Sequence, residues 1–98
     1  MWILEGSESD QGALKFRLRP GAIKTVGRAP RSDFIVDAAL VSRLHCRLTA
    51  SKDRLDVLDL ASTNGTFVND KRVKAATLAV GDRLRVGRVE LKVARQER

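Results

Sequence analysis

The chain of 98 residues contains one cysteine, one histidine and no tyrosine. The lone cysteine, Cys46, cannot form an internal disulfide, which favours a reducing compartment, nuclear or cytoplasmic. A single histidine next to a single cysteine cannot supply the four ligands of a structural zinc site. We therefore expect no metal ion and no disulfide framework.

Long apolar runs are also absent. No run approaches the roughly 20 residues needed to span a bilayer, and residues 1–5 lack the basic and apolar segments of a signal peptide. The length fits one domain over residues 1–98. We expect a monomer that does not associate with membranes.

The motifs of common enzymes are missing as well. The chain has no Gly-rich phosphate loop and no dinucleotide fingerprint, so no cofactor is expected. Ser42 does not lie in a Gly-x-Ser-x-Gly elbow, and His45 borders an apolar strand, where a histidine usually packs. We predict no catalytic residue and no enzymatic activity.

Charge of one sign dominates, because 19 basic residues oppose 12 acidic ones and leave a net charge of +7. Such an excess favours anionic partners, which include nucleic acids and phosphoproteins. Only three phenylalanines and one tryptophan are available to stack on bases, so a single-strand binder is disfavoured. A basic β-domain that binds nucleic acid electrostatically is the alternative to a reader of phosphoproteins.

Apolar and polar residues alternate with a period of two in many short segments, as in half-buried strands. Asn64-Gly65, Asn69-Asp70 and Gly87-Arg88 are turn signals between such segments. No segment has a convincing helical period, and the best candidate, 72–80, is short and ends at Gly81. The pattern predicts an all-β sandwich or barrel, with strands at 2–4, 14–18, 23–26, 34–36, 46–50, 55–60, 66–68, 83–86 and 89–93.

Three predicted loops have a common chemistry. They contain Gly27-Arg28, then Ser42 to His45, then Ser62 to Thr66, and each adjoins the end of a strand. Together they offer guanidinium groups, hydroxyls, an amide and backbone N–H groups. This set suits a phosphate dianion, which has three strong acceptor oxygens.

The three motifs, Gly27-Arg28, Ser42-Arg43-x-His45 and Ser62-Thr63-Asn64-Gly65-Thr66-x-x-Asn69, resemble the signature blocks of the forkhead-associated (FHA) family. Residues 78–87 are similar to the end of that family's domain. The resemblance covers residues 23–93, and residues 95–98 are expected to form a frayed tail. It implies an FHA-type β-sandwich of about eleven short strands with binding loops at one end.

The resemblance also implies a function: phosphothreonine-dependent binding of partner proteins, with no catalysis. Arg28, Ser42, Arg43 and Thr63 would contact the phosphate, and Asn64 would hold the peptide backbone. Structural support of the site would come from five further residues: Gly27, His45, Ser62, Gly65 and Asn69.

Two aspects of the ligand stay open. Apolar residues 38–41 would favour hydrophobic residues after the phosphothreonine, whereas basic residues 71–74 would favour acidic ones, and the net charge inclines us to an acidic segment. Residues 1–5 and 18–21 resemble the N-terminal FHA domain of nibrin-like DNA double-strand-break repair proteins, which implies a role in the DNA damage response.

Overall fold

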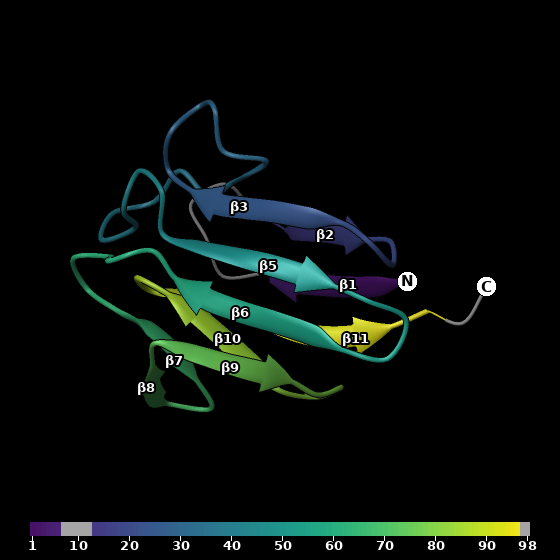
Figure 1. Ribbon diagram of the computed structural model, residues 1–98. Coiled ribbons are helices and arrows are strands. Elements are labelled where there is room, and N and C mark those ends of the chain that lie inside the picture. The colour runs from purple at the N-terminus through teal and green to yellow at the C-terminus, as the bar shows by residue number, and fades with distance from the viewer. Residues whose placement is uncertain (7–12, 97–98) are drawn as a thin grey trace.

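The computed structural model describes residues 1–6 and 13–96, and within these ranges the chain forms two packed β-sheets made of eleven strands (Figure 1). One sheet has six strands in the order β2 (Leu14–Leu18), β1 (Trp2–Gly6), β11 (Val89–Arg95), β10 (Arg83–Val86), β7 (Thr66–Val68) and β8 (Lys71–Val73). The other has five, in the order β4 (Phe34–Ile35), β3 (Ile23–Gly27), β5 (Cys46–Ala50), β6 (Leu55–Asp59) and β9 (Ala75–Leu78). The predicted all-β sandwich is confirmed.

Alternation along the strands explains how the two sheets bury a common core. In β5, Cys46, Leu48 and Ala50 are buried while Arg47 and Thr49 face solvent. The core contains leucines from both sheets that are wholly buried: Leu4, Leu18, Leu48, Leu55, Leu84 and Leu91. At one edge, the rings of Phe16 on β2 and Phe34 on β4 stack with centroids 4.5 Å apart and so join the two sheets.

Residues 72–80, the best helical candidate, are extended instead. Lys71–Val73 pairs with β7 through a tight turn, in which Asn69 and Asp70 both have positive φ (50° and 69°). Ala75–Leu78 pairs with β6, and Leu78 is buried. Backbone pairing with two different sheets decides the conformation here, against the weak helical preference of an alanine pair.

The two ends of the described chain are paired side by side. The amine of Met1 donates to the Gln96 carbonyl oxygen at 2.9 Å, and the Gln96 N–H donates to the Met1 carbonyl oxygen at 2.8 Å. Arg95, expected in a frayed tail, is the last residue of β11, and its guanidinium lies 4.6 Å from the Trp2 ring. Residues 97 and 98 of the predicted tail lie outside the described residues.

No helix of the described residues could cross a bilayer.

Candidate functional site

Three loops meet at one end of the sandwich because of the strand pairing. β3 ends beside the start of β5, where Val26 is paired with Cys46, and Cys46 is also paired with Asp59 at the end of β6. The loops that follow β3, precede β5 and follow β6 are therefore neighbours. They form the left end of the molecule in Figure 1, away from Met1. The structure thus brings together the three segments selected from the sequence.

A surface hollow of about 780 Å³ lies between these loops. Its lining includes all five side chains that were predicted to contact a phosphopeptide. They are joined by apolar residues from the segment before β5 and from the 60–65 loop. The full lining is Arg28, Ala39, Leu40, Val41, Ser42, Arg43, Leu44, Ala61, Thr63 and Asn64.

Arg28 is anchored to the chain segment that faces it. Its backbone N–H donates to the Ser42 carbonyl oxygen at 3.0 Å, and its side-chain Nε donates to the Val41 carbonyl oxygen at 3.1 Å. The two Nη groups make no hydrogen bond with the described residues, nor does any described carboxylate form an ion pair with Arg28 or Arg43. Within the described part of the chain, the hollow therefore has two arginines without a carboxylate partner, one of them held in place through Nε.

Two other polar groups link the loops across the hollow. The Ser42 hydroxyl oxygen accepts the Thr63 backbone N–H at 3.0 Å, so its own proton can still be donated to a ligand. The Asn64 amide nitrogen donates to the Leu40 carbonyl oxygen at 3.0 Å. Leu40 has a positive φ of 72° and its side chain is 46% exposed. These bonds fix the hollow before any ligand arrives.

His45 lies beneath the hollow and is completely buried. Its Nδ1 accepts the Ser42 backbone N–H at 3.1 Å, so the ring proton is on Nε2, which lies 2.9 Å from the Gly65 carbonyl oxygen and donates to it. One ring thus joins the loop before β5 to the loop before β7. Both ring nitrogens are engaged, which leaves neither as a base for chemistry in the hollow.

Asp59 organises the 62–66 loop, and sequence reasoning missed it. Its Oδ1 accepts the Ser62 hydroxyl at 2.5 Å and the Thr66 hydroxyl at 2.7 Å, and the Ser62 hydroxyl oxygen accepts the Gly65 N–H at 3.0 Å. Burial raises the pKa of this carboxyl, but the hydrogen bonds from Ser62 and Thr66 outweigh that effect and the pKa is lowered from its usual value. The Asp-x-x-Ser spacing, which suits a local side-chain-to-backbone turn, was the available signal.

Gly27 allows the first two loops to touch. A β-carbon there would overlap the Arg43 carbonyl oxygen and lie 2.7 Å from the Ser32 hydroxyl. That same carbonyl accepts the Ala29 N–H and the Ser32 hydroxyl, each at 3.1 Å. Ser32, also missed from the sequence, is buried and joins the two loops.

Gly65 and Asn69 were both predicted to support the site, but they lie in different parts of the structure. Gly65 has a φ of 91°, and a β-carbon on it would lie 2.6 Å from Nε of Arg72. Asn69 is not beside the hollow but follows the far end of β7, where its side chain accepts the Arg83 N–H and donates to Asp82, both at 3.0 Å. It supports the β7–β8 turn rather than the binding loops.

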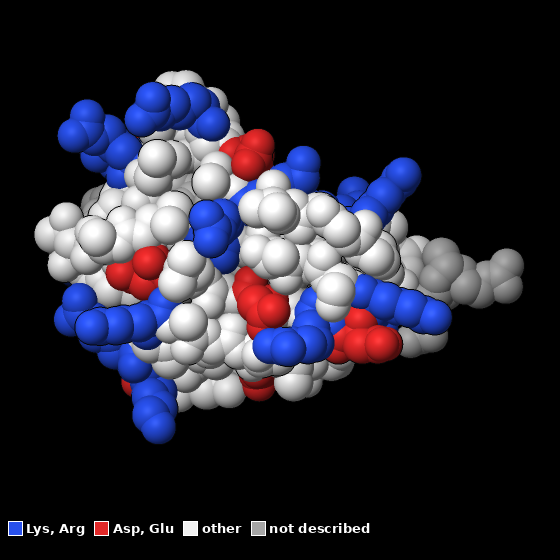
Figure 2. Space-filling view, viewed as in Figure 1, with Lys and Arg blue, Asp and Glu red and all other residues white. Residues whose placement is uncertain are grey.

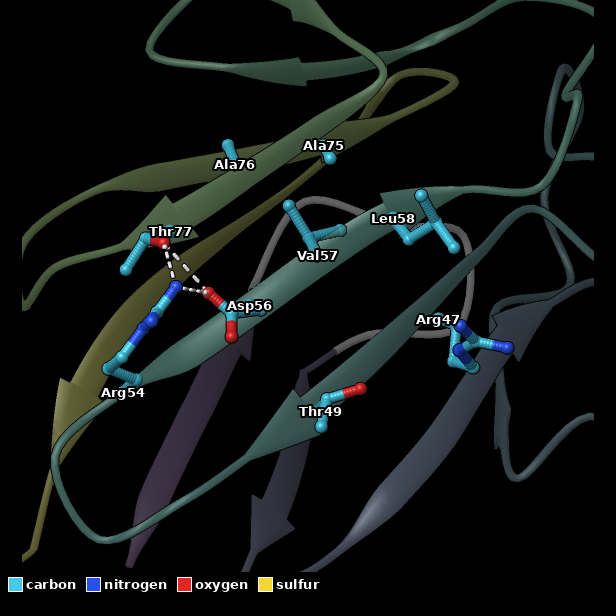
Figure 3. Close-up of a pocket in the computed structure, with 9 residues that line it drawn as sticks. All are labelled: Arg47, Thr49, Arg54, Asp56, Val57, Leu58, Ala75, Ala76 and Thr77. Carbon is cyan, nitrogen blue, oxygen red and sulfur yellow. Dashed lines mark hydrogen bonds and ion pairs between the residues drawn. The ribbon is translucent and has the colours of Figure 1, made fainter.

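A separate hollow, of about 470 Å³, lies on the outer face of the five-stranded sheet (Figure 3). There the guanidinium of Arg54 points to Asp56 and Thr77, and it bonds to a side-chain oxygen of each at 3.1 Å. Arg54 is thus already paired with a carboxylate, whereas Arg28 and Arg43 have no such partner among residues 1–6 and 13–96. The end of the sandwich is the better anion site.

Comparisons with known proteins agree with this fold and site. The family model of the FHA domain matches residues 24–87. The glycogen accumulation regulator GarA of Mycobacterium tuberculosis (strain ATCC 25618 / H37Rv) is 40% identical over 70 residues, which are 71% of this chain and 43% of GarA. The chain therefore spans less than half the length of that relative.

Two solved structures cover nearly the whole domain. The crystal structure of the FhaA FHA domain, complexed with the intracellular domain of Rv3910, has a TM-score of 0.86 at 32% identity, over 96% of this chain and 100% of that chain. A structure from a structural and functional analysis of phosphothreonine-dependent FHA domain interactions has a TM-score of 0.84 at 30% identity, over 98% and 97% of the two chains.

These similarities support neither the nibrin-like relationship suggested by residues 1–5 and 18–21 nor the role in DNA damage that it implied. The family model, GarA and both structures agree with the three motifs and with the sandwich that positions them. The chain belongs to the FHA family.

Proposed function

We propose that the hollow between the three loops binds a phosphothreonine of a partner protein, with Arg28, Ser42, Arg43, Thr63 and Asn64 as the contacting side chains. The family is one of phosphothreonine-dependent interaction modules. The observation that carries the assignment of residues is that all five side chains line one hollow. In addition, no described carboxylate pairs with its two arginines.

The geometry suggests what each group does. The two Nη groups of Arg28 would engage two phosphate oxygens, because Nε is already held by Val41. Ser42 would donate its hydroxyl proton, and Arg43 and Thr63 would add contacts from the opposite sides. Asn64, with its amide nitrogen on Leu40, retains its side-chain oxygen to accept a backbone N–H of the ligand.

Binding without catalysis fits the same arrangement. His45 is the only histidine of the chain, and both its nitrogens are hydrogen-bonded to backbone groups. Three of the groups that would hold a phosphothreonine, those of Arg28, Ser42 and Asn64, are already hydrogen-bonded to the backbone of the loops, which favours recognition. We propose that the module works as a monomer inside the cell, where ATP-dependent kinases supply the phosphate.

Apolar side chains beside the polar ones give the threonine methyl group a place to pack. Burial of one methyl-sized group contributes about 0.8 kcal/mol, so this contact alone would favour phosphothreonine over phosphoserine roughly fourfold. A larger preference requires that phosphoserine also be held in a poorer position.

We propose that the partner segment is acidic, since the net charge is +7. Figure 2 shows blue Lys and Arg side chains above and below at the end of the molecule where the loops meet. A field of this sign would draw in an acidic chain and raise its association rate.

The test is fluorescence anisotropy with three peptides of one Ser-Asp-Thr-Asp-type sequence, which carry phosphothreonine, phosphoserine or unmodified threonine. We expect micromolar binding of the phosphothreonine peptide, about −8 kcal/mol, weaker binding of the phosphoserine peptide and none of the unmodified one. Arg28→Ala should weaken binding by about 2–3 kcal/mol, roughly 30- to 150-fold.

Arg19→Ala is the matched control, because it removes the same charge at the far end of the sandwich. Arg19 is exposed and belongs to the turn that is hydrogen-bonded to Ala50, at the opposite end of β5 from the hollow. Equal losses in the two variants would contradict the assignment of Arg28. A failure to bind any member of a degenerate phosphothreonine library would overturn the function itself.

A further inference from the structure

A second hollow adjoins the proposed phosphothreonine site. It measures about 680 Å³ and is lined by Ala29, Pro30, Arg31, Arg43 and Leu44. Arg43 and Leu44 line both hollows, so the two adjoin at these residues. The sequence motifs did not select Arg31, and the proposed phosphate contacts do not use it.

The chemistry of this hollow is that of an anion site with one apolar wall. Arg31 and Arg43 are both exposed, and neither forms an ion pair with any carboxylate in residues 1–6 or 13–96. The acidic residue nearest to Arg31 in sequence is Asp33, whose Oδ2 accepts the N–H of Thr25 at 2.8 Å and its hydroxyl at 3.1 Å. Two guanidinium groups thus border a space in which no described carboxylate compensates their charge.

The backbone around this hollow is held in place. The turn that carries Arg31 is closed by the Ser32 N–H, which donates to the Ala29 carbonyl oxygen at 3.0 Å, and Pro30 fixes one dihedral angle within it. The turn is then bonded to the Arg43 carbonyl oxygen through Ala29 and Ser32. The Cα atoms of both arginines therefore have a fixed separation, so less conformational freedom would be lost on binding.

We infer that this second hollow binds a second anionic side chain of the same partner segment, held between Arg31 and Arg43. The inference rests on the proposed function, since the phosphothreonine places the segment. Because the two hollows share Arg43 and Leu44, and an extended chain advances about 3.3–3.6 Å per residue, the second anion would lie roughly one to three residues from the phosphothreonine. The anion is either a carboxylate or a second phosphate, because both accept hydrogen bonds from arginine in the same way.

The experiment uses one phosphothreonine peptide with neutral flanks and two derived series. In one series a single glutamate is moved through each of the three positions on either side of the phosphothreonine; in the other, a phosphoserine is moved in the same way. Affinities are measured by anisotropy at fixed ionic strength for the native protein, Arg31→Ala and the distant control Arg19→Ala. Circular dichroism and thermal unfolding establish that each variant is folded.

We expect one position at which the second anion tightens binding by about three- to tenfold, more for phosphate than for carboxylate. Arg31→Ala should abolish that gain and leave the affinity for the neutral-flank peptide within about twofold of native, while Arg19→Ala should keep the gain. A gain confined to phosphoserine identifies a reader of doubly phosphorylated segments, and a gain from both anions identifies a reader of acidic segments.

Either of two results would overturn the inference: no position gives a gain, or Arg31→Ala and Arg19→Ala reduce it equally. In both cases the neutral-flank peptide still reports on the first hollow. If that peptide itself fails to bind the native protein, the proposed function fails, so the two failures are distinguishable.

Discussion

Asp59 shows how one carboxylate controls the shape of a binding loop. Its Oδ1 accepts hydrogen bonds from the hydroxyls of Ser62 and Thr66, which lie on either side of Gly65. The Ser62 hydroxyl oxygen in turn accepts the Gly65 N–H. The same glycine's carbonyl oxygen receives the His45 ring proton. A change at Asp59 is therefore transmitted to the loop that carries Thr63 and Asn64, although Asp59 does not line the hollow.

Acid should loosen this loop. The pKa of Asp59 is lowered in the folded chain, so its contribution to stability is fully present above the unfolded pKa of about 3.9 and is lost as pH falls below it. Urea unfolding between pH 7 and pH 2.5 should show a free energy of unfolding that declines below about pH 4.

Asp59→Asn should lower that free energy by about 1–3 kcal/mol at pH 7 and reduce the acid decline, because position 59 then has no carboxyl to protonate. Asp53→Asn, which alters a carboxylate with 85% side-chain exposure, is the control. An unchanged acid decline in Asp59→Asn would show that other groups are responsible.

At the level of single residues, the sequence predicted much of the site. The five side chains that the FHA resemblance predicts to contact a phosphopeptide lie in loops that adjoin strand ends, and all five line the hollow. Asp59 was missed although its partners Ser62 and Thr66 are only three and seven residues away, whereas Ser32 was missed because its partner is brought close by tertiary structure. For Ser32 that partner is a carbonyl oxygen eleven residues away, and nothing in the local sequence marks such a contact.

Among the elements, the β7–β8 hairpin depends on two residues in the left-handed region. Asn69 and Asp70 both have positive φ, and the Asn69 side chain bonds to both Asp82 and Arg83 on the neighbouring turn and strand. This hairpin joins the edge of the six-stranded sheet to the segment that leads into the other sheet. The β7–β8 turn therefore influences how the chain enters both sheets.

Two substitutions separate backbone conformation from hydrogen bonding at Asn69. Asn69→Gly removes the two side-chain bonds, which should cost about 1–2 kcal/mol at this exposed position. Asn69→Ala removes the same bonds but keeps a β-carbon at positive φ, a conformation that glycine adopts without strain, so it should cost about 1 kcal/mol more than Asn69→Gly. Urea denaturation measures the loss of unfolding free energy in both variants. Equal losses would mean that the backbone at position 69 relaxes in the alanine variant.

The strands found from sequence are those with a clear pattern, either alternation or a short run rich in apolar residues. β8 and β9 were missed because neither has it: β8 is Lys-Arg-Val, and β9 buries only Leu78 fully while its alanines contribute little contrast. These short strands are specified by their neighbours β7 and β6 rather than by their own pattern.

For the whole molecule, the excess of positive charge should appear in binding kinetics. An acidic phosphothreonine peptide should bind several-fold more weakly at 0.5 M salt than at 0.05 M, mainly through slower association, because the screening length shrinks from about 14 Å to about 4 Å. Stopped-flow fluorescence measures the rates. A peptide with neutral flanks should change much less, and an equal change in the two would argue against attraction by the field of the domain.

The paired ends of the chain have a consequence for architecture. Met1 and Gln96 are hydrogen-bonded to each other at the end of the sandwich away from the binding loops, as Figure 1 shows for Met1. Polypeptide joined to either end would leave from the face opposite the ligand, and both attachment points would be a single hydrogen-bonded pair apart. This geometry suits domain insertion. If the domain were inserted into a loop of a host protein, it should separate the two loop ends very little, and its binding loops should still face away from the host. A phosphopeptide titration of such a chimera, compared with the isolated domain, would show whether affinity is kept.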